Sequence, residues 1–196
     1  MENLFTPNAL IAPTEQSPVV FVDSNYNYDE YSIAEWKFWD PNFANDLESD
    51  CNNSYGIEPI TGKRKDQNWG ISSHNPTGFA ILGSRGPEEG DYEENEYSNS
   101  YLLHGVEKDW KGVVIFGDGH IEVLETLYPI QSTYISDSGD AVPDNLFKED
   151  DDPAQPVDAD YGNSRGQLAD AVLTHVKKDD VNDDDKAGGC EDFLHD

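Results

Sequence analysis

Basic side chains are scarce in this sequence. Twelve lysines and arginines stand against 41 aspartates and glutamates, which gives a formal net charge of −29. Nucleic-acid binding depends on clustered Lys and Arg that neutralise phosphates, and an anionic membrane surface attracts basic segments for the same electrostatic reason. We therefore exclude unaided binding to nucleic acid, and the charge argues against binding to an anionic membrane surface. The charge instead favours cations, basic partners or a salty medium.

Long apolar runs and catalytic motifs are also absent. No stretch approaches the roughly 18 apolar residues of a membrane span, so we expect no membrane insertion, and no signal peptide is visible. There is no nucleophile elbow, Walker loop or dinucleotide fingerprint, so we expect no enzymatic activity. Cysteine is limited to Cys51 and Cys190, for which one bridge and two free thiols are both open alternatives.

Aromatic side chains, in contrast, are plentiful. Four Trp, ten Tyr and eight Phe supply large core-building groups, which argues against disorder throughout the chain. Composition divides the 196 residues into an extended arm over 1–18, a β-rich head over 19–147 and an acidic tail over 148–196. The predicted fold class is α+β and β-rich. It has a small antiparallel sheet with long loops, plus a C-terminal helix on an acidic linker.

The strongest local prediction is a β-hairpin near the middle of the chain. An apolar run over 113–116 and a second one over 121–124 flank Gly117-Asp118-Gly119. Glycine tolerates the positive φ that such a turn requires, so we expect strands on either side of it, with Val114 and Phe116 or their neighbours buried. Two further strands are predicted, one over 79–83 and one over 18–23 that is buried on both faces.

Two other segments carry helix signals. Residues 164–178 follow an acidic linker and begin with Ser and Gln at capping-box spacing, and their apolar residues fall on one face of a helix. An isolated helix of this length is marginal, so it needs a surface to dock on, either its own head or a neighbouring subunit. Residues 32–39 suit either a short helix or a strand.

The segment 99–124 also resembles a known family. His104-Gly105, Trp110, Gly112 and the following strand-turn-strand are similar, in order, to the C-terminal head of the prepilin-like proteins abundant in planctomycetes and related bacteria, and Asn53-Ser54-Tyr55-Gly56 resembles a Ser-Tyr step in those heads. The resemblance covers roughly residues 50–147. The family's N-terminal pilin helix has no counterpart in this sequence, so the resemblance concerns the head only.

Two acidic loops have spacings that suit calcium. The first lies beyond the predicted helix and matches the ligand spacing of an EF-hand at Asp180, Asn182, Asp184 and Glu191. The second contains Asp137, Asp140 and Asp144, next to the final predicted strand. A solvated acidic tail and an ordinary turn are the respective alternatives. Calcium is the only cofactor that the sequence suggests.

These observations predict a non-enzymatic structural subunit that assembles with copies of itself into an extracellular or surface filament or a similar repeating assembly. An extracellular location is implied by the family resemblance alone. A virion shell or decoration protein fits the same physical facts. The other alternative is a calcium- or glycan-binding module, in which Tyr26, Tyr28, Tyr31, Trp36 and Trp39 would form the stacking platform.

Overall fold

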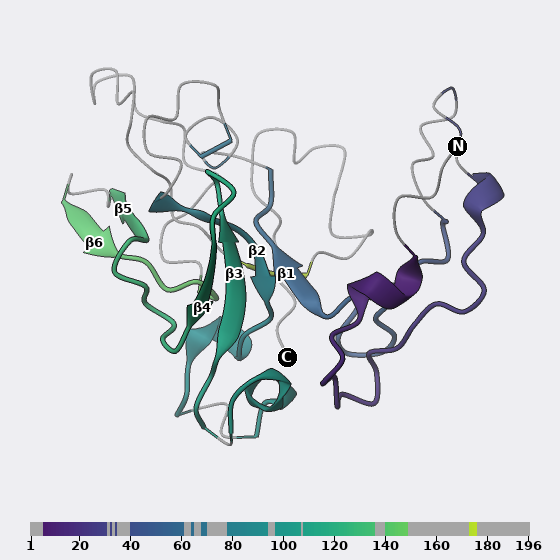
Figure 1. Cartoon of the computed structure of the whole chain (residues 1–196), viewed down its shortest axis with the longest axis horizontal. Coiled ribbons are helices and arrows are strands. Elements are labelled where there is room, and N and C mark those ends of the chain that lie inside the picture. Colours follow the sequence, from purple (N-terminus) through teal and green to yellow (C-terminus); the bar gives the residue numbers. More distant parts are fainter. Residues whose placement is uncertain are drawn as a thin grey trace.

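The main element of the fold is a four-stranded antiparallel sheet of order β1-β2-β3-β4 (Figure 1). In this computed structural model the described residues are 6–30, 32, 34, 40–60, 64, 68–69, 78–93, 97–106, 108–135, 140–148 and 173–175. The sheet consists of β1 (Tyr55–Ile57), β2 (Ala80–Ser84), β3 (Gly112–Phe116) and β4 (Ile121–Leu124). A second, two-stranded sheet pairs β5 (Thr133–Ile135) with β6 (Ala141–Pro143).

Short 3-10 helices lie before and between these strands. η1 (Pro7–Leu10) and η2 (Tyr28–Glu30) precede β1, while η5 (Glu88–Gly90) and η6 (Asn99–Leu103) lie between β2 and β3. In Figure 1 the β5–β6 pair lies on one side of the main sheet and the N-terminal segment lies on the other. None of the helices within the described ranges is long and apolar enough to cross a membrane.

The β-rich, antiparallel character predicted from the sequence is confirmed. β3 and β4 form the expected hairpin, in which Val113 faces Val123 and Ile115 faces Ile121. Val114 and Phe116 are both fully buried on one face of the sheet. The strand predicted over 79–83 is present as β2, one residue later.

The C-terminal helix finds no support at the only residues of 164–178 that the structure describes. Leu173, Thr174 and His175 are extended rather than helical, and Thr174 pairs with Ile57 of β1 in an antiparallel bridge. All three residues are at least 98% buried, with exposures of 2%, 1% and 1%. Hydrogen bonds to a distant strand edge here prevail over the local helical pattern. The remainder of that range lies outside the described residues.

The strand predicted over 18–23 is wrong. Only Val20 makes a bridge, parallel to Cys51, and Phe21 is 44% exposed rather than buried. The residues opposite, 44–52, form turns held by side chains. For example, the Asn52 side chain accepts a hydrogen bond from the Ala44 amide at 2.8 Å and donates one to the Phe21 carbonyl at 3.0 Å. These turns offer no regular strand edge for the apolar run to join.

The core lies against the inner face of the sheet and is built around Trp110. This side chain is fully buried, its Nε1 donates a hydrogen bond to the Arg85 carbonyl at 2.9 Å, and its ring meets Phe147 edge-to-face at 5.0 Å. The buried cluster comprises Ala80, Tyr101, Trp110, Val114, Phe116, Leu124, Leu127, Leu146, Phe147 and Leu173. Leu173, from the tail, thus completes a core that the head begins.

The N-terminal segment also packs against the head. Residues Pro7–Leu10 form η1 instead of an extended arm, and Ala12 and Ser17 are buried. The Ala12 amide donates a hydrogen bond to Ser54 Oγ at 3.0 Å, just before β1. Both described ends of the chain therefore meet at the start of the sheet.

Candidate functional site

The hairpin tip, which carries part of the family resemblance, is a tight turn. The Gly119 amide donates to the Phe116 carbonyl at 2.8 Å and the Phe116 amide donates to the His120 carbonyl at 3.0 Å, while Gly119 has φ +85. A non-glycine residue is strained in that region, which explains the Asp-Gly step. The turn therefore has a structural reason independent of any ligand.

Asp118 and His120 are engaged with each other at this tip. Asp118 Oδ1 accepts a hydrogen bond from the His120 amide at 3.0 Å and lies 2.5 Å from His120 Nδ1. These bonds, the backbone one first, lower the pKa of Asp118. The His120 ring stacks on Phe116, with ring centroids 4.5 Å apart. In the described part of the chain, no group of three or more His, Cys, Asp or Glu residues could hold a metal ion.

Only two of the predicted calcium ligands, Asp140 and Asp144, lie among the described residues. Asp140 is exposed just before β6, whereas Asp144 is 1% exposed and accepts a hydrogen bond from Ser132 Oγ at 2.8 Å. That bond ties the end of β6 to the residue before β5. The other predicted ligands lie outside the described residues: Asp137, Asp180, Asn182, Asp184 and Glu191. Calcium binding stays a prediction.

The predicted aromatic platform is likewise partly described. Tyr26 meets Tyr28 edge-to-face at 4.8 Å and Phe43 at 6.1 Å. Tyr31 and Trp36 lie outside the described residues, as does Trp39. The described contacts are therefore those of one ring with its neighbours, and a glycan-binding role stays a prediction.

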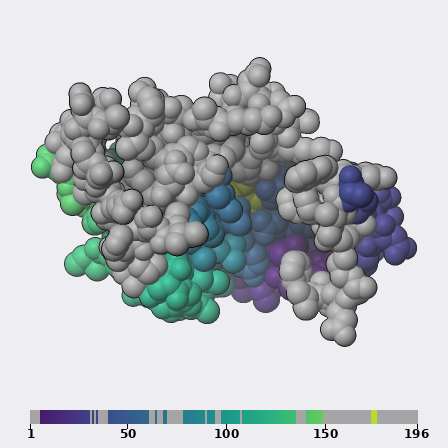
Figure 2. Space-filling model, turned by 90° about the horizontal axis from the view of Figure 1, so that it is seen from above, coloured from purple at the N-terminus to yellow at the C-terminus, as the bar shows by residue number. Residues whose placement is uncertain are grey.

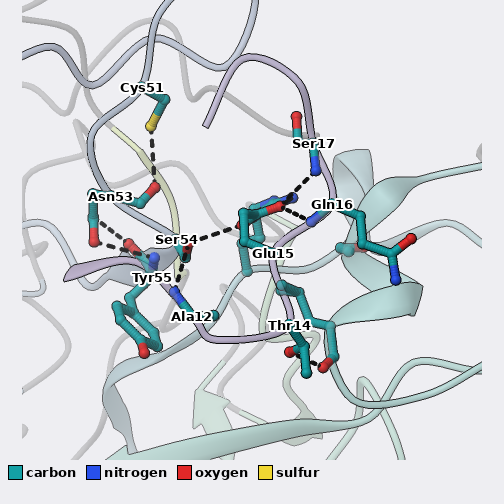
Figure 3. Close-up of polar contacts among 12 residues, drawn as sticks. Ala12, Thr14, Glu15, Gln16, Ser17, Cys51, Asn53, Ser54 and Tyr55 are labelled. Atoms are coloured by element: carbon teal, nitrogen blue, oxygen red, sulfur yellow. Dashed lines mark hydrogen bonds and ion pairs between the residues drawn. The ribbon is translucent and has the colours of Figure 1, made fainter. Parts of the chain in front are cut away.

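A buried polar cluster joins the N-terminal segment to the sheet (Figure 3). Its centre is Glu15, whose carboxylate accepts hydrogen bonds from two nitrogens of the Arg85 guanidinium. Nη1 donates to Oε2, and Nη2 donates to Oε1 at 2.8 Å. Ser54 Oγ donates to Glu15 Oε2 at 2.8 Å, and the Ser17 amide donates to Oε1 at 2.8 Å. The side chains of Glu15 and Arg85 are 4% and 2% exposed. This is a buried, bidentate ion pair between segments distant in the sequence.

The pKa of Glu15 is set by opposing effects. Burial acts to raise it, but the hydrogen bonds and charge of Arg85, with the donors Ser17 and Ser54, outweigh burial and hold the pKa below its usual value. A carboxyl group whose pKa is lowered by folding stabilises the folded state fully above its unfolded pKa, about 4.3 for glutamate. That contribution is lost as the pH falls through the folded pKa.

We therefore expect the stability difference between wild type and Glu15→Gln to depend on pH. Above about pH 5 the wild type should be the more stable by a constant margin, and this margin should shrink as the pH drops below about 4. Urea unfolding of both proteins from pH 7 to pH 3 measures it. Other carboxyl groups whose pKa is lowered, such as Asp40, are present in both proteins, so their pH-dependent contribution to stability cancels in the difference. A margin that does not change with pH would contradict an ionised Glu15 in the folded state.

Cys51 lies beside this cluster and is a free, fully buried thiol. Its Sγ donates to the Asn53 carbonyl at 3.1 Å. Burial raises its pKa to about 11, so the thiol stays protonated at neutral pH. Since the thiolate is the reactive form of cysteine, burial lowers the reactivity of Cys51. Its predicted alternative partner, Cys190, lies outside the described residues.

The outward face of the main sheet carries an apolar surface that sequence reasoning missed. The register aligns one residue from each strand across the sheet: Ile57 pairs with Leu82, Leu82 with Ile115, and Ile115 with Ile121. The Val113–Val123 pair lies beside this row. We call these six residues the apolar sheet face. Ile121 and Val123 are 65% and 67% exposed, Ile57 is 46% exposed and Val113 is 37% exposed.

Such a surface departs from the usual pattern. An antiparallel sheet with one buried face normally alternates apolar residues with polar residues on the solvent side. Here Val114 and Phe116 fill the core, while Val113 and Ile115, which alternate with them along β3, are apolar too. The signal was present in the sequence as an unbroken Val-Val-Ile-Phe run, but strand register was needed to join it to β1 and β2. Contiguous exposed apolar surface marks an interaction site.

Searches against protein-family models, curated proteins and solved structures found no match.

Proposed function

We propose that this chain is a non-enzymatic structural subunit that assembles with copies of itself into an extracellular or surface filament or a similar repeating assembly. The observation that supports this most is the apolar sheet face, which spans all four strands and of which Ile57, Val113, Ile121 and Val123 are exposed. The sequence resemblance to pilin heads points in the same direction, since such heads occur in repeating assemblies.

A second copy of the same face is a suitable partner for this surface. Two sheets pack face to face about 10 Å apart when both present apolar residues. Fully burying one Val or Ile side chain contributes about 1.5–3 kcal/mol. Six apolar residues on each copy therefore provide enough burial to offset part of the entropy lost on association.

Replacing Ile121 and Val123 together by threonine should weaken self-association roughly 100-fold, because each lost apolar contact is worth about one factor of ten. Threonine keeps a β-branched side chain, so β4 should remain paired. Sedimentation velocity over a concentration series, with electron microscopy of the same samples, measures the effect.

A matched control uses exposed apolar residues away from the sheet. Val106 and Ile130 are 63% and 96% exposed and belong to none of the four strands of the main sheet. Their double threonine variant should assemble like the wild type. Equal assembly of both variants and the wild type would exclude the apolar sheet face as the contact. A wild type that stays monomeric at every concentration would refute the assembly function itself.

A further inference from the structure

The edge of β1 is filled by residues Leu173–His175. The Ile57 amide donates to the Thr174 carbonyl at 3.0 Å, and the Thr174 amide donates to the Ile57 carbonyl at 3.3 Å. The Leu173 amide donates to the Leu146 carbonyl at 2.7 Å, and His175 Nε2 lies 3.0 Å from the Asn53 carbonyl. The segment thus extends the sheet beyond β1 by an isolated antiparallel bridge.

Leu173 sits where the sheet has no side chains. A Cβ added at Gly56 would lie 2.9 Å from the Leu173 carbonyl carbon, 3.0 Å from its oxygen and 3.1 Å from its Cβ. One added at Gly83 would lie 2.9 Å from Leu173 Cδ1. The two glycines therefore form a groove that fits this leucine closely, and Leu173 is part of the main core.

The groove recognises the segment through backbone hydrogen bonds and one apolar side chain, which are the same whichever copy of the chain supplies them. Residues 149–172 lie between Lys148 and Leu173, and a stretch of that length can span at most about 80 Å. Figure 2 shows only a small patch of the yellow residues 173–175, beside atoms of the N-terminal half, and all three residues are at most 2% exposed. A segment from another copy can therefore take this position only after the chain's own segment has left it.

We propose that in the assembly Leu173–His175 of one copy fill the β1 edge of its neighbour, so that subunits are linked by strand exchange. This rests on the proposed assembly function and names its linkage. Exchanging an identical element costs little, because every contact of the closed subunit is remade between subunits. Added strands of this kind gain affinity from main-chain hydrogen bonds and specificity from the side-chain pocket.

Two single variants separate the donor from the acceptor. Gly56→Ala blocks the groove, since all three close contacts of the added Cβ are with Leu173, and it leaves the donor segment intact. Leu173→Asp removes the donor side chain and leaves the groove intact. Neither variant can exchange with itself. Refolded together in equal amounts, they should form a 1:1 complex in which Gly56→Ala donates its segment to Leu173→Asp.

Native mass spectrometry of the mixture, with one variant isotopically labelled, detects the complex. All proteins in this experiment also carry Ile121→Thr with Val123→Thr, so that association through the apolar sheet face does not contribute. The matched control is the double variant Gly56→Ala with Leu173→Asp, which has no donor and should not pair with Leu173→Asp. Absence of a 1:1 complex in the first mixture, or its presence in the control, would overturn strand exchange.

A peptide of residues 168–180 tests the groove if Leu173→Asp folds poorly alone. At a concentration of about 100 times its Kd the peptide should raise the Tm of the full-length Leu173→Asp protein by about 5–10 °C. The same peptide carrying Leu173→Asp should not, and equal effects of both peptides would overturn the proposal. If the wild type forms filaments but the two variants do not complement each other, strand exchange is refuted and the assembly function stands. If the variants complement each other but the wild type forms no filaments, strand exchange stands and the assembly function is refuted.

Discussion

Replacing Arg85 by methionine should lower the free energy of unfolding by about 3–5 kcal/mol. Removing one partner of a buried ion pair leaves the other charge buried without compensation. Glu15 would keep the bonds from Ser17 and Ser54 but lose both bonds from the guanidinium. We expect the N-terminal segment, which carries Glu15, to detach from the head in this variant. Urea unfolding followed by circular dichroism measures the change.

The exposed pair Lys111–Glu125 provides a matched control. Its atoms Nζ and Oε1 are 2.7 Å apart, but the side chains are 34% and 69% exposed. Lys111→Met should leave the unfolding curve close to that of the wild type, since exposed ion pairs contribute little. The paired variant Glu15→Gln with Arg85→Met should recover part of the loss. Equal effects of Arg85→Met and Lys111→Met would contradict a structural role for the buried pair.

Assembly should strengthen strongly as sodium chloride rises from 0.1 M to 1 M. A net charge of −29 makes neighbouring copies repel, and the carboxylate of Glu125, directly after β4, is 69% exposed. The Debye length falls from about 10 Å to about 3 Å over this range, so the repulsion is screened while apolar burial and main-chain hydrogen bonds remain.

The critical concentration for assembly, measured by sedimentation at each salt concentration, should therefore fall. The Ile121→Thr with Val123→Thr variant should not recover wild-type assembly at 1 M salt, because screening does not replace lost apolar contact. An assembly that dissolves between 0.1 M and 1 M would contradict this, and would indicate contacts made by ion pairs to the few basic residues.

The hairpin was predictable because its determinants are local. Gly117 to Gly119 specify the turn, and the apolar runs on either side specify the strands without reference to the rest of the chain. The predicted C-terminal helix finds no support at its described residues, where a distant partner decides. Leu173 lies in a helical pattern, but the glycine groove and the bridge of Thr174 to β1 hold this segment at the sheet edge. Sequence periodicity contains no information about that edge.

The sites divide in the same way. Asp118 and His120 stand two positions apart in the predicted turn, and the structure finds them bonded to each other. The Glu15–Arg85 pair joins residues 70 positions apart. Nothing in either residue's surroundings in the sequence distinguishes it from the many other charged residues. The apolar sheet face was hidden for a related reason, since it exists only once four short strands are in register.

The meeting of both ends at residues 53–57 has a consequence for the order of folding during synthesis. His175 contacts Asn53 across a separation of 122 residues. At about 5–20 residues per second, the ribosome delivers the partner on the order of 10 s after β1 itself. Contacts of such long separation form late. The β1 edge is therefore without this partner in the nascent chain after the β3–β4 hairpin can close, and during that interval it is open to a strand from another copy.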